Sequence, residues 1–367
     1  MTNIRLYDYQ IEMKERIEAA FRSCRSVMVQ MPTGTGKTHV LASVVMDEVQ
    51  RAKNTCVWIV AHRRELVEQI EESLVGQSGL ACSEYQSSFI KVMSIQWLSK
   101  HYGELDEKPS LIVIDEAHHA LARTYAEVMN TYPEAKKLGV TATPGRLNMK
   151  GFSDLFDVLL QSWPTKKFIA DGRLSLYDYM SIKADSEEQR MVFGLTKRGA
   201  DGDFSLKEMS EKLDVRPSIE RLCDTVLRYA PGKKGITYAI DVDHAEHIAE
   251  YYREHGIPAV AISWKTSADE RKRIVEEFKS NGDSAEKGEV SSGAVRVLVN
   301  VDLFGEGFDC PDVEFIQLAR PTLSLAKYLQ QVGRGMRVFD GKKYCLILDN
   351  VGLYRLFGLP SDDRDWQ

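Results

Sequence analysis

Several features that would place this chain in a simple class are missing from its sequence. The six cysteines are far apart and form no Cys-x-x-Cys pair, so neither a zinc site nor a disulfide framework is predicted. No run of about 18 apolar residues occurs, and a membrane span is not expected. The N-terminal stretch MTNIRLYDYQ also lacks the apolar core of a secretory signal. We therefore expect a protein of the reducing cytoplasm.

An excess of positive charge is missing too. Lysine and arginine number 48 against 54 acidic residues, which gives a net charge of −6. Any binding of nucleic acid must therefore depend on a local basic surface and not on the overall charge. With 43% hydrophobic and 28% charged residues, the composition is typical of a globular protein, and 367 residues suffice for two domains with separate cores.

Apolar, strand-like runs alternate with amphipathic stretches along the whole chain. This alternation is typical of an α/β fold with parallel sheets. Two sheets of similar size are predicted from the runs at 26–30, 56–61, 89–93, 111–115 and 137–142, and at 235–240, 258–262, 295–300, 314–319 and 344–349.

The stretch between the two predicted sheets is polar. Residues 184–214 mix charges with glycines, which predicts a linker with a short helix and a domain boundary near residue 180. A second polar stretch, 280–294, predicts a surface loop. The expected division is 1–180 for the first domain, 181–215 for the linker, 216–355 for the second domain and 356–367 for a tail.

The first chemical signal is MPTGTGKT at residues 31–38. It departs from the nucleotide-binding pattern G-x-x-x-x-G-K-[ST], because Met31 stands where the first glycine is required. It keeps two glycines before Lys37 and Thr38, between a strand-like run and a helical one, and backbone N–H groups at such a helix start bind phosphate. The pattern predicts Lys37 on the β and γ phosphates and Thr38 on Mg²⁺. A glycine-rich turn with a surface lysine is the alternative.

A second signal is LIVIDEAHHA at 111–120, an apolar strand that ends in two acids. Carboxylates at the carboxyl end of a strand lie where open α/β sheets bind ligands. Asp115 is predicted to hold Mg²⁺, and Glu116 to orient and deprotonate the attacking water of a phosphoryl transfer. An acidic helix cap with surface histidines is the alternative for this stretch taken alone.

Together with TATP (141–144) and QQVGRGMR (330–337), these two stretches resemble the ordered motifs of superfamily 2 helicases of the DEAH-box kind. Family loops commonly read A-x-T-G-T-G-K-T, which would account for Met31. The variants are most similar to phage and bacterial DNA helicases of the UvsW, RecG and RadD kinds. The resemblance implies two tandem RecA-like domains with parallel sheets, ATP and Mg²⁺ in the cleft between them, and the cytoplasm of a bacterium or of a phage-infected host.

The resemblance also implies roles for residues outside the first two motifs. Arg334 and Arg337 would be arginine fingers at the γ-phosphate, which in other NTPases are worth about 10³–10⁵ in rate. Gln330 joins the catalytic set. The residues that would couple the nucleotide state to the strand-binding cleft are His118, Thr141, Thr143 and Gln330.

Two more stretches are implied to contact the nucleotide, in addition to the loop residues Thr33, Gly34, Thr35 and Gly36. VNVDLFGEGFDCP (299–311) is similar to motif five, which implies Gly307 and Asp309 near the nucleotide and Gly305 on a nucleic-acid phosphate. LYDYQIEM resembles the adenine-reading motif, in which Gln10 satisfies N6 and N7 of the base. Tyr7 replaces the family's arginine and could stack on adenine, and packing at a helix start is the alternative.

Nucleic-acid contacts are implied in two further places. AHRRELVEQ (61–69) resembles motif Ia, with Arg63 and Arg64 on backbone phosphates. VMSIQWL (92–98) resembles the next contact motif, with Ser94 and Gln96 at its polar positions. Trp97 either stacks on a base or is buried in the core.

The implied function is an ATP-hydrolysing motor that moves along nucleic acid and unwinds or remodels it. Single-stranded or branched DNA is favoured over RNA, although no motif reads the 2′-hydroxyl. A strand-separating wedge would come from 280–294 or from the 194–204 loop. An ATP-switched nucleic-acid clamp and an RNA helicase are the alternatives, and we expect a monomer that uses protein partners for targeting.

Overall fold

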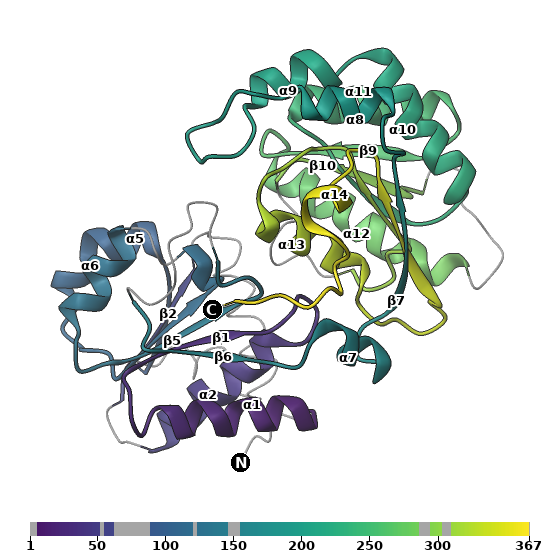
Figure 1. Cartoon of the computed structure of the whole chain (residues 1–367). Helices are drawn as coiled ribbons and strands as arrows, with labels where there is room; N and C mark the ends of the chain where they lie inside the picture. The colour runs from purple at the N-terminus through teal and green to yellow at the C-terminus, as the bar shows by residue number, and fades with distance from the viewer. Residues whose placement is uncertain are drawn as a thin grey trace. The chain divides into compact units, whose positions relative to one another are not determined.

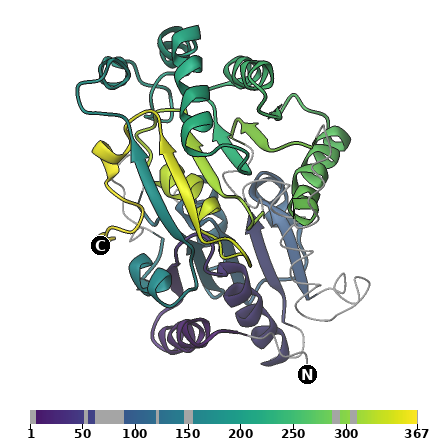
Figure 2. The ribbon, with the colours of Figure 1, turned by 90° about the vertical axis from the view of Figure 1, so that its right-hand side faces the viewer.

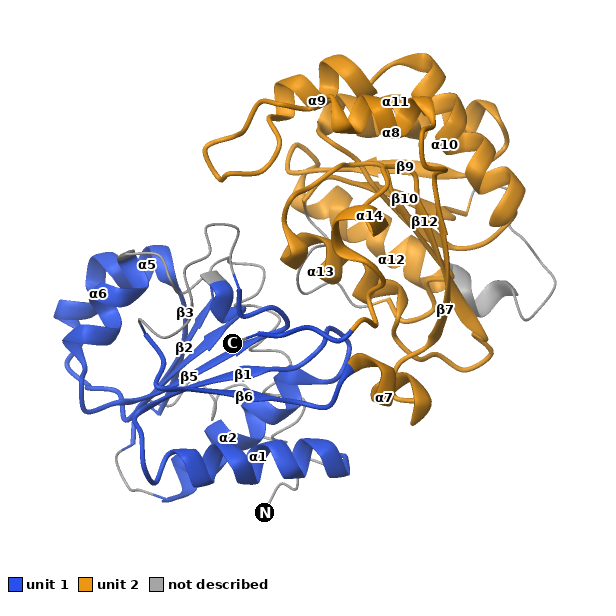
Figure 3. Ribbon diagram, in the orientation of Figure 1, with its two compact units in different colours: residues 1–164, 363–367 blue, residues 165–362 orange. Residues whose placement is uncertain are grey.

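The structure, a computed structural model of the chain, describes residues 6–51, 55–61, 89–119, 123–145, 155–285, 294–302 and 310–366. The chain divides into two compact units (Figure 3). The first comprises residues 1–164 and 363–367, and the second comprises residues 165–362. Each unit contains a six-stranded sheet in which every described strand pair is parallel (Figure 1).

The sheet of the first unit has the strand order β3-β2-β4-β5-β1-β6. Its strands are β1 (Ser26–Gln30), β2 (Val57–Ala61), β3 (Ile90–Ser94), β4 (Leu111–Asp115), β5 (Lys136–Thr141) and β6 (Val158–Gln161), and the helices described with them are α1 (Asp8–Ala20), α2 (Lys37–Arg51), α5 (Ile95–His101) and α6 (Arg123–Thr131). β1 and β2 are buried along their whole length, as expected for a parallel sheet covered on both faces.

The sheet of the second unit has the order β7-β12-β11-β8-β10-β9. Its strands are β7 (Leu176–Ser181), β8 (Gly235–Tyr238), β9 (Ala259–Ile262), β10 (Val297–Asn300), β11 (Phe315–Leu318) and β12 (Tyr344–Asp349). The helices of this unit are α7 (Thr165–Ala170), α8 (Glu187–Phe193), α9 (Leu206–Leu213), α10 (Arg216–Tyr229), α11 (Val242–Glu254), α12 (Ala268–Ala285), α13 (Leu325–Gly335) and α14 (Tyr354–Phe357).

Side chains of the second sheet alternate between two apolar clusters. On β11, Phe315 belongs to one cluster and Ile316 to the other, and on β12 Leu346 and Ile347 divide in the same way. Successive side chains of a strand point to opposite faces, so the two clusters are the cores of the two faces of the sheet.

The α/β fold with two parallel sheets is confirmed, and each predicted strand is present. The sequence did not predict β6 and β7. β7 pairs with β12 over its whole length, so it belongs to the second sheet (Figure 2). For this reason the division between the units falls at residue 164, whereas the expected boundary was near 180.

The segment expected to be a linker, 181–215, contains α8 and α9. Its apolar side chains Val192, Leu195 and Met209 are buried in a core cluster of the second unit. The beginning of the expected surface loop at 280–294 continues α12 as far as Ala285, and residues 286–293 lie outside the described part of the chain. Among the described residues, no helix is long and apolar enough to cross a membrane.

Candidate functional site

The loop of MPTGTGKT runs from the end of β1 into the start of α2. Met31 is fully buried, and its N–H donates to the Thr141 carbonyl at 3.0 Å, so sheet pairing continues one residue past β1. Gly34 and Gly36 have φ values of 86° and 78°, which residues with a side chain rarely adopt. Backbone conformation therefore favours glycine at both places, while position 31 is occupied by a core side chain.

Lys37 is the first residue of α2 and Thr38 is the second. The Lys37 ammonium lies 3.5 Å from the Met31 carbonyl oxygen, so the side chain is directed back over the loop. A glycine loop, a helix start and a lysine directed over the loop are the parts from which phosphate sites are built.

Two side chains of α1 form hydrogen bonds to the backbone of this loop. The Tyr9 hydroxyl donates to the Thr35 carbonyl at 3.0 Å, and Gln10 Nε2 donates to the same oxygen at 3.2 Å. Gln10 Oε1 accepts from the Tyr7 N–H at 2.9 Å. Gln10, predicted to read adenine, thus lies against the loop with both ends of its amide bonded within the chain. Tyr9 had no predicted role, although it stands beside Gln10 in the same motif.

The two acids of DEAHH differ in their surroundings. Asp115 ends β4, and its Oδ1 accepts from the N–H of Glu116 at 3.0 Å. Glu116 has a left-handed backbone with φ 49°, a conformation that costs a residue other than glycine about 1–2 kcal/mol. Its side chain is buried, and Oε2 lies 3.3 Å from Nδ1 of His118.

His118 joins the acids to TATP. Its Nδ1 lies 3.0 Å from Thr141 Oγ1, and this oxygen accepts from the Thr143 N–H at 3.1 Å and donates to the Thr143 carbonyl at 3.3 Å. A proton on Nδ1 suits both neighbours, because a carboxylate only accepts and the Thr141 proton is directed to Thr143. A buried path therefore runs from Glu116 to Thr143.

These motifs meet because their strands are neighbours. β4, β5 and β1 are adjacent in the sheet, with Asp115 in register with Val140 and Gln30 in register with Thr141. Gln30 Nε2 also donates to the Ala142 carbonyl at 3.1 Å. The carboxyl ends of parallel strands share one edge of the sheet, which is where open α/β folds bind their ligands.

The side chains at this edge fit a nucleotide with Mg²⁺. The loop supplies closely approachable backbone amides, and Lys37 supplies a cation. The Thr38 hydroxyl and the Asp115 carboxylate are oxygen ligands of the kind that Mg²⁺ prefers. Glu116 lies against His118, whereas the Asp115 carboxylate contacts the Glu116 N–H at the end of β4.

In the second unit, the predicted catalytic residues lie on or just after α13. Gln330 and Arg334 are buried, with 6% and 5% of their surface exposed, and Arg337 follows the helix cap at Met336. Tyr238, at the end of β8, is close enough to both arginines to feel their charge. Burial raises the pKa of its hydroxyl, and the two guanidinium groups oppose that shift.

The motif-five stretch is described only at its ends. Asp302 has φ 51° and its carboxylate pairs with buried Arg320 at 2.7 Å. The predicted residues Gly305, Gly307 and Asp309 lie outside the described residues, as do Arg63 and Arg64 of the predicted motif Ia.

The remaining predicted nucleic-acid residues lie at the start of α5. Ser94 is the N-cap, and its hydroxyl accepts from the Trp97 N–H at 3.3 Å. Gln96 is exposed. Trp97 has 45% of its surface exposed and stacks on His101 with 4.5 Å between ring centroids, which excludes the alternative of a core tryptophan.

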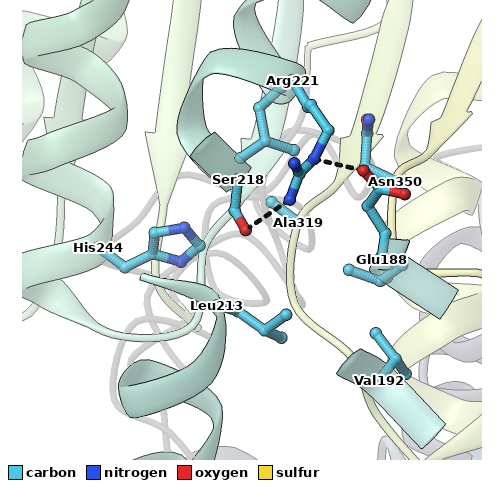
Figure 4. Close-up of a pocket in the computed structure, with 10 residues that line it drawn as sticks. Glu188, Val192, Leu213, Ser218, Arg221, His244, Ala319 and Asn350 are labelled. Atoms are coloured by element: carbon cyan, nitrogen blue, oxygen red, sulfur yellow. Dashed lines mark hydrogen bonds and ion pairs between the residues drawn. The ribbon is translucent and has the colours of Figure 1, made fainter. Parts of the chain in front are cut away.

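A pocket in the second unit is lined by Arg221, His244 and Asn350 among others (Figure 4). Its cavity volume of ≈ 30 Å³ suits ordered water. Burial lowers the pKa of His244 to about 4, and its Nδ1 accepts from the Ile240 N–H at 3.2 Å, which leaves the proton on Nε2. No described residue accepts a hydrogen bond from this Nε2. A water molecule in the pocket can accept that bond, and no larger ligand is needed to satisfy the histidine.

Two family models match the chain over the same motifs. The model of the type III restriction enzyme res subunit matches residues 3–146, which include the loop, DEAHH and TATP. The model of the helicase conserved C-terminal domain matches residues 217–339, which include QQVGRGMR. The chain belongs to the superfamily 2 helicases, and its two sheets are those of tandem RecA-like domains. Membership of this family implies the use of ATP.

Individual relatives support the same family. A 51.5 kDa protein of a Lactococcus phage (isolate 7-9) is 31% identical over 93% of this chain and 69% of its own length. The DNA 3′-5′ translocase XPB2 of Sulfurisphaera tokodaii is 25% identical over 95% of this chain and 82% of its own. The chain matches IRC3 of Saccharomyces cerevisiae at 26% identity over 98% of its residues, but it spans only 55% of that protein.

A solved structure shows the same fold. The ATP-dependent type ISP restriction-modification enzyme LlaBIII, in a structure bound to DNA, superposes with a TM-score of 0.68 at 17% identity. The superposition covers 94% of this chain and 27% of that one.

Proposed function

We propose that this protein is an ATP-dependent motor that moves along DNA and unwinds or remodels it. The observation that carries the proposal is the buried path from Glu116 through His118 to Thr141 and Thr143. A carboxylate placed to activate water is thereby connected to the neighbouring strand end. Hydrolysis at the loop can then alter the strand ends that lead to nucleic-acid contacts.

In this proposal the first unit binds ATP. The loop at 33–36 and Lys37 hold the phosphates, and Thr38 and Asp115 hold Mg²⁺, which neutralises phosphate charge when bound. Glu116 orients the attacking water and accepts its proton. Gln10 contacts adenine, and its bond to the Thr35 carbonyl makes the loop sensitive to that contact.

The second unit completes the reaction. Arg334 and Arg337 stabilise the charge that develops on the γ-phosphate, Gln330 assists them, and Gly307 and Asp309 contribute nucleotide contacts. Hydrolysis is then fast only when the two units close on ATP. Alternation between closed and open states moves the units along one strand.

DNA is the proposed substrate. The motif variants resemble the DNA-motor branch, and the relative XPB2 is named a DNA translocase. Arg63, Arg64 and Gly305 are proposed to contact phosphates, together with Ser94 and Gln96, while exposed Trp97 stacks on a base.

The test is ATP hydrolysis by the purified protein in the presence of single-stranded DNA, branched DNA or RNA. We expect stimulation by DNA and less by RNA. If no DNA stimulates ATP hydrolysis, the proposal of a DNA motor is wrong. Stimulation by RNA alone would establish the RNA helicase in its place.

A Glu116→Gln variant separates the motor from an ATP-switched clamp. In a motor, movement measured by displacement of a bound protein from DNA is lost with hydrolysis. In a clamp, no displacement occurs even in the wild-type protein, and the variant binds DNA more tightly with ATP. Deletion of 283–291 tests the wedge: unwinding lost with ATPase retained supports 280–294, and unchanged unwinding contradicts it.

A further inference from the structure

Each end of α13, the helix that carries Arg334 and leads to Arg337, is bonded to a charged side chain that lies outside the helix. We propose that Asp203 and Lys342 are positioning residues that fix α13, and with it both arginines, in the geometry that ATP hydrolysis requires. The proposal rests on the proposed function, because it assumes that these arginines act on ATP. Nothing in the motifs indicates either residue.

Asp203 holds the N-terminal end. Its carboxylate is 1% exposed and accepts from the Leu323 N–H at 2.7 Å, from the Thr322 hydroxyl at 2.7 Å and from the Lys327 ammonium at 3.1 Å. Thr322 and Leu323 directly precede the N-cap Ser324, and Lys327 is in the first turn of α13. One buried carboxylate thus fixes both the approach to the helix and its first turn.

Lys342 holds the C-terminal end. Its ammonium donates to the carbonyls of Gly335 at 2.7 Å, Arg337 at 2.9 Å and Pro311 at 3.0 Å. An ammonium has three donors, so all are used. Gly335 is the last helical residue, and Arg337 is one of the two proposed arginine fingers. Pro311 ends the motif-five stretch, so Lys342 also connects that stretch to the C-terminal end of α13.

The signs of the two charges suit the helix. A helix carries partial positive charge at its N-terminus and partial negative charge at its C-terminus, and here an anion meets the first end and a cation the second. Burial alone would raise the pKa of Asp203, but the bonds from Leu323, Thr322 and Lys327 outweigh it and the pKa lies below its ordinary value. Burial lowers the pKa of Lys342, and the nearby Cys345, Asp312 and Glu314 oppose that shift.

Close packing removes the remaining freedom of α13. A Cβ atom at Gly335 would lie 2.3 Å from Cys345 Sγ and 2.8 Å from Ile316 Cγ1. The helix therefore lies against β11 and β12 without space for a side chain. With its face packed and both ends bonded, α13 cannot shift or turn unless a charged contact is broken. A misplacement of about 1 Å can cost about 10²-fold in an enzymatic rate.

The experiment measures DNA-stimulated ATPase of the full chain as a function of ATP concentration. For Lys342→Ala we expect kcat to fall by about 10- to 100-fold, with KM for ATP and affinity for single-stranded DNA within about twofold of wild type. Lys342→Arg keeps the charge and should recover part of the rate. Lys343→Ala is the matched control, since the neighbouring Lys343 is exposed, and it should behave as wild type.

Asp203→Asn provides a second variant that does not depend on Lys342. It removes the charge and keeps the size, and we expect a fall of about tenfold in kcat at unchanged KM. Asp224→Asn on the exposed face of α10 is its control. A folded Lys342→Ala or Asp203→Asn protein with wild-type kcat would overturn the proposal. It would also be overturned if the loss of rate only matched the loss of folded protein in a thermal melt.

Amide hydrogen exchange separates this proposal from the proposed function. In both variants the amides of α13 should exchange faster, and those of α11 should not. If wild-type protein hydrolyses no ATP, the proposed function fails, while faster exchange confined to α13 still supports the positioning of this helix. Unchanged exchange of α13 in both variants would refute the positioning role whatever the ATPase result.

Discussion

In the first unit, Glu116 and Thr141 lie at the ends of adjacent strands, so the register of the sheet sets their separation. In the second unit, Arg334 lies on a helix whose placement depends on side-chain contacts at both ends. A sheet edge has one geometry, because backbone hydrogen bonds define it. A helix held by Asp203 and Lys342 has a geometry that single substitutions can change. The separation of the proposed site residues is therefore fixed in the first unit, whereas the position of the proposed arginines in the second unit can be tuned.

The largest expected effect is at Arg334. An Arg334→Ala variant should lose about 10³–10⁵ in kcat, because arginine fingers stabilise the charge of the transition state. The affinity for ATP measured with a fluorescent analogue should change little, since the proposed phosphate-binding loop is in the first unit. Arg190→Ala, at an exposed position of α8, is the control for loss of an arginine. A kcat within tenfold of wild type would contradict the assignment.

The corresponding change in the first unit is Glu116→Gln. We expect kcat to fall by about 10²–10⁴, the usual contribution of a general base. ATP-dependent binding to DNA should be kept, because the variant still binds the nucleotide. Equal loss of ATP binding and turnover would indicate that Glu116 supports the fold of the loop and not the chemistry.

The buried path of the first unit can be broken at His118. In His118→Ala the bond to Thr141 is lost, and the stimulation of ATPase by DNA should fall by about 5- to 150-fold, the range of typical coupling energies. The ATPase measured without DNA should change less. Thr141→Val should have the same effect, and the double variant should be no worse than either, since both break one path. Additive losses would show that the two side chains act separately.

The smallest expected effect concerns the packing of α13. Gly335→Ala places a Cβ atom against Cys345 and Ile316, so it should lower the free energy of unfolding by about 1–3 kcal/mol, as overpacking does. Urea denaturation measures this. Gly103→Ala is the control, because a Cβ atom there meets no atom within 4 Å. A stability equal to wild type would mean that α13 moves easily and that close packing at Gly335 does not fix its position.

The sequence predicted those parts of the fold that depend on continuous apolar runs. β1 and β4 are recognisable because both faces are buried. β7 reads LYDYMS, and each of its residues is exposed or half-buried at a sheet edge, so it has no continuous buried apolar run. The segment at 181–215 is polar because α8 and α9 bury only a few side chains, among them Val192 and Met209.

The candidate site shows the same limit. The motifs identified Glu116, His118 and Thr141, which the structure brings together. They did not identify Asp203, because its contact with Leu323 joins segments far apart in the sequence and has no fixed spacing. They did not identify Lys342 either, because it is close to α13 in the sequence but stands outside QQVGRGMR. In the sequence, Lys342 and Lys343 are equivalent neighbours, and only the fold shows which one meets the end of α13.

The backbone of Glu116 has a consequence for how this protein can change. At φ 49° the backbone of a glycine or an asparagine has a lower energy than that of glutamate, so this position stores backbone strain of about 1–2 kcal/mol. Screening for thermostability alone would favour the substitutions Glu116→Gly and Glu116→Asn, and both discard the proposed base. The protein thus keeps a trade-off at this residue, and a library selected for stability without a hydrolysis assay should accumulate inactive variants there.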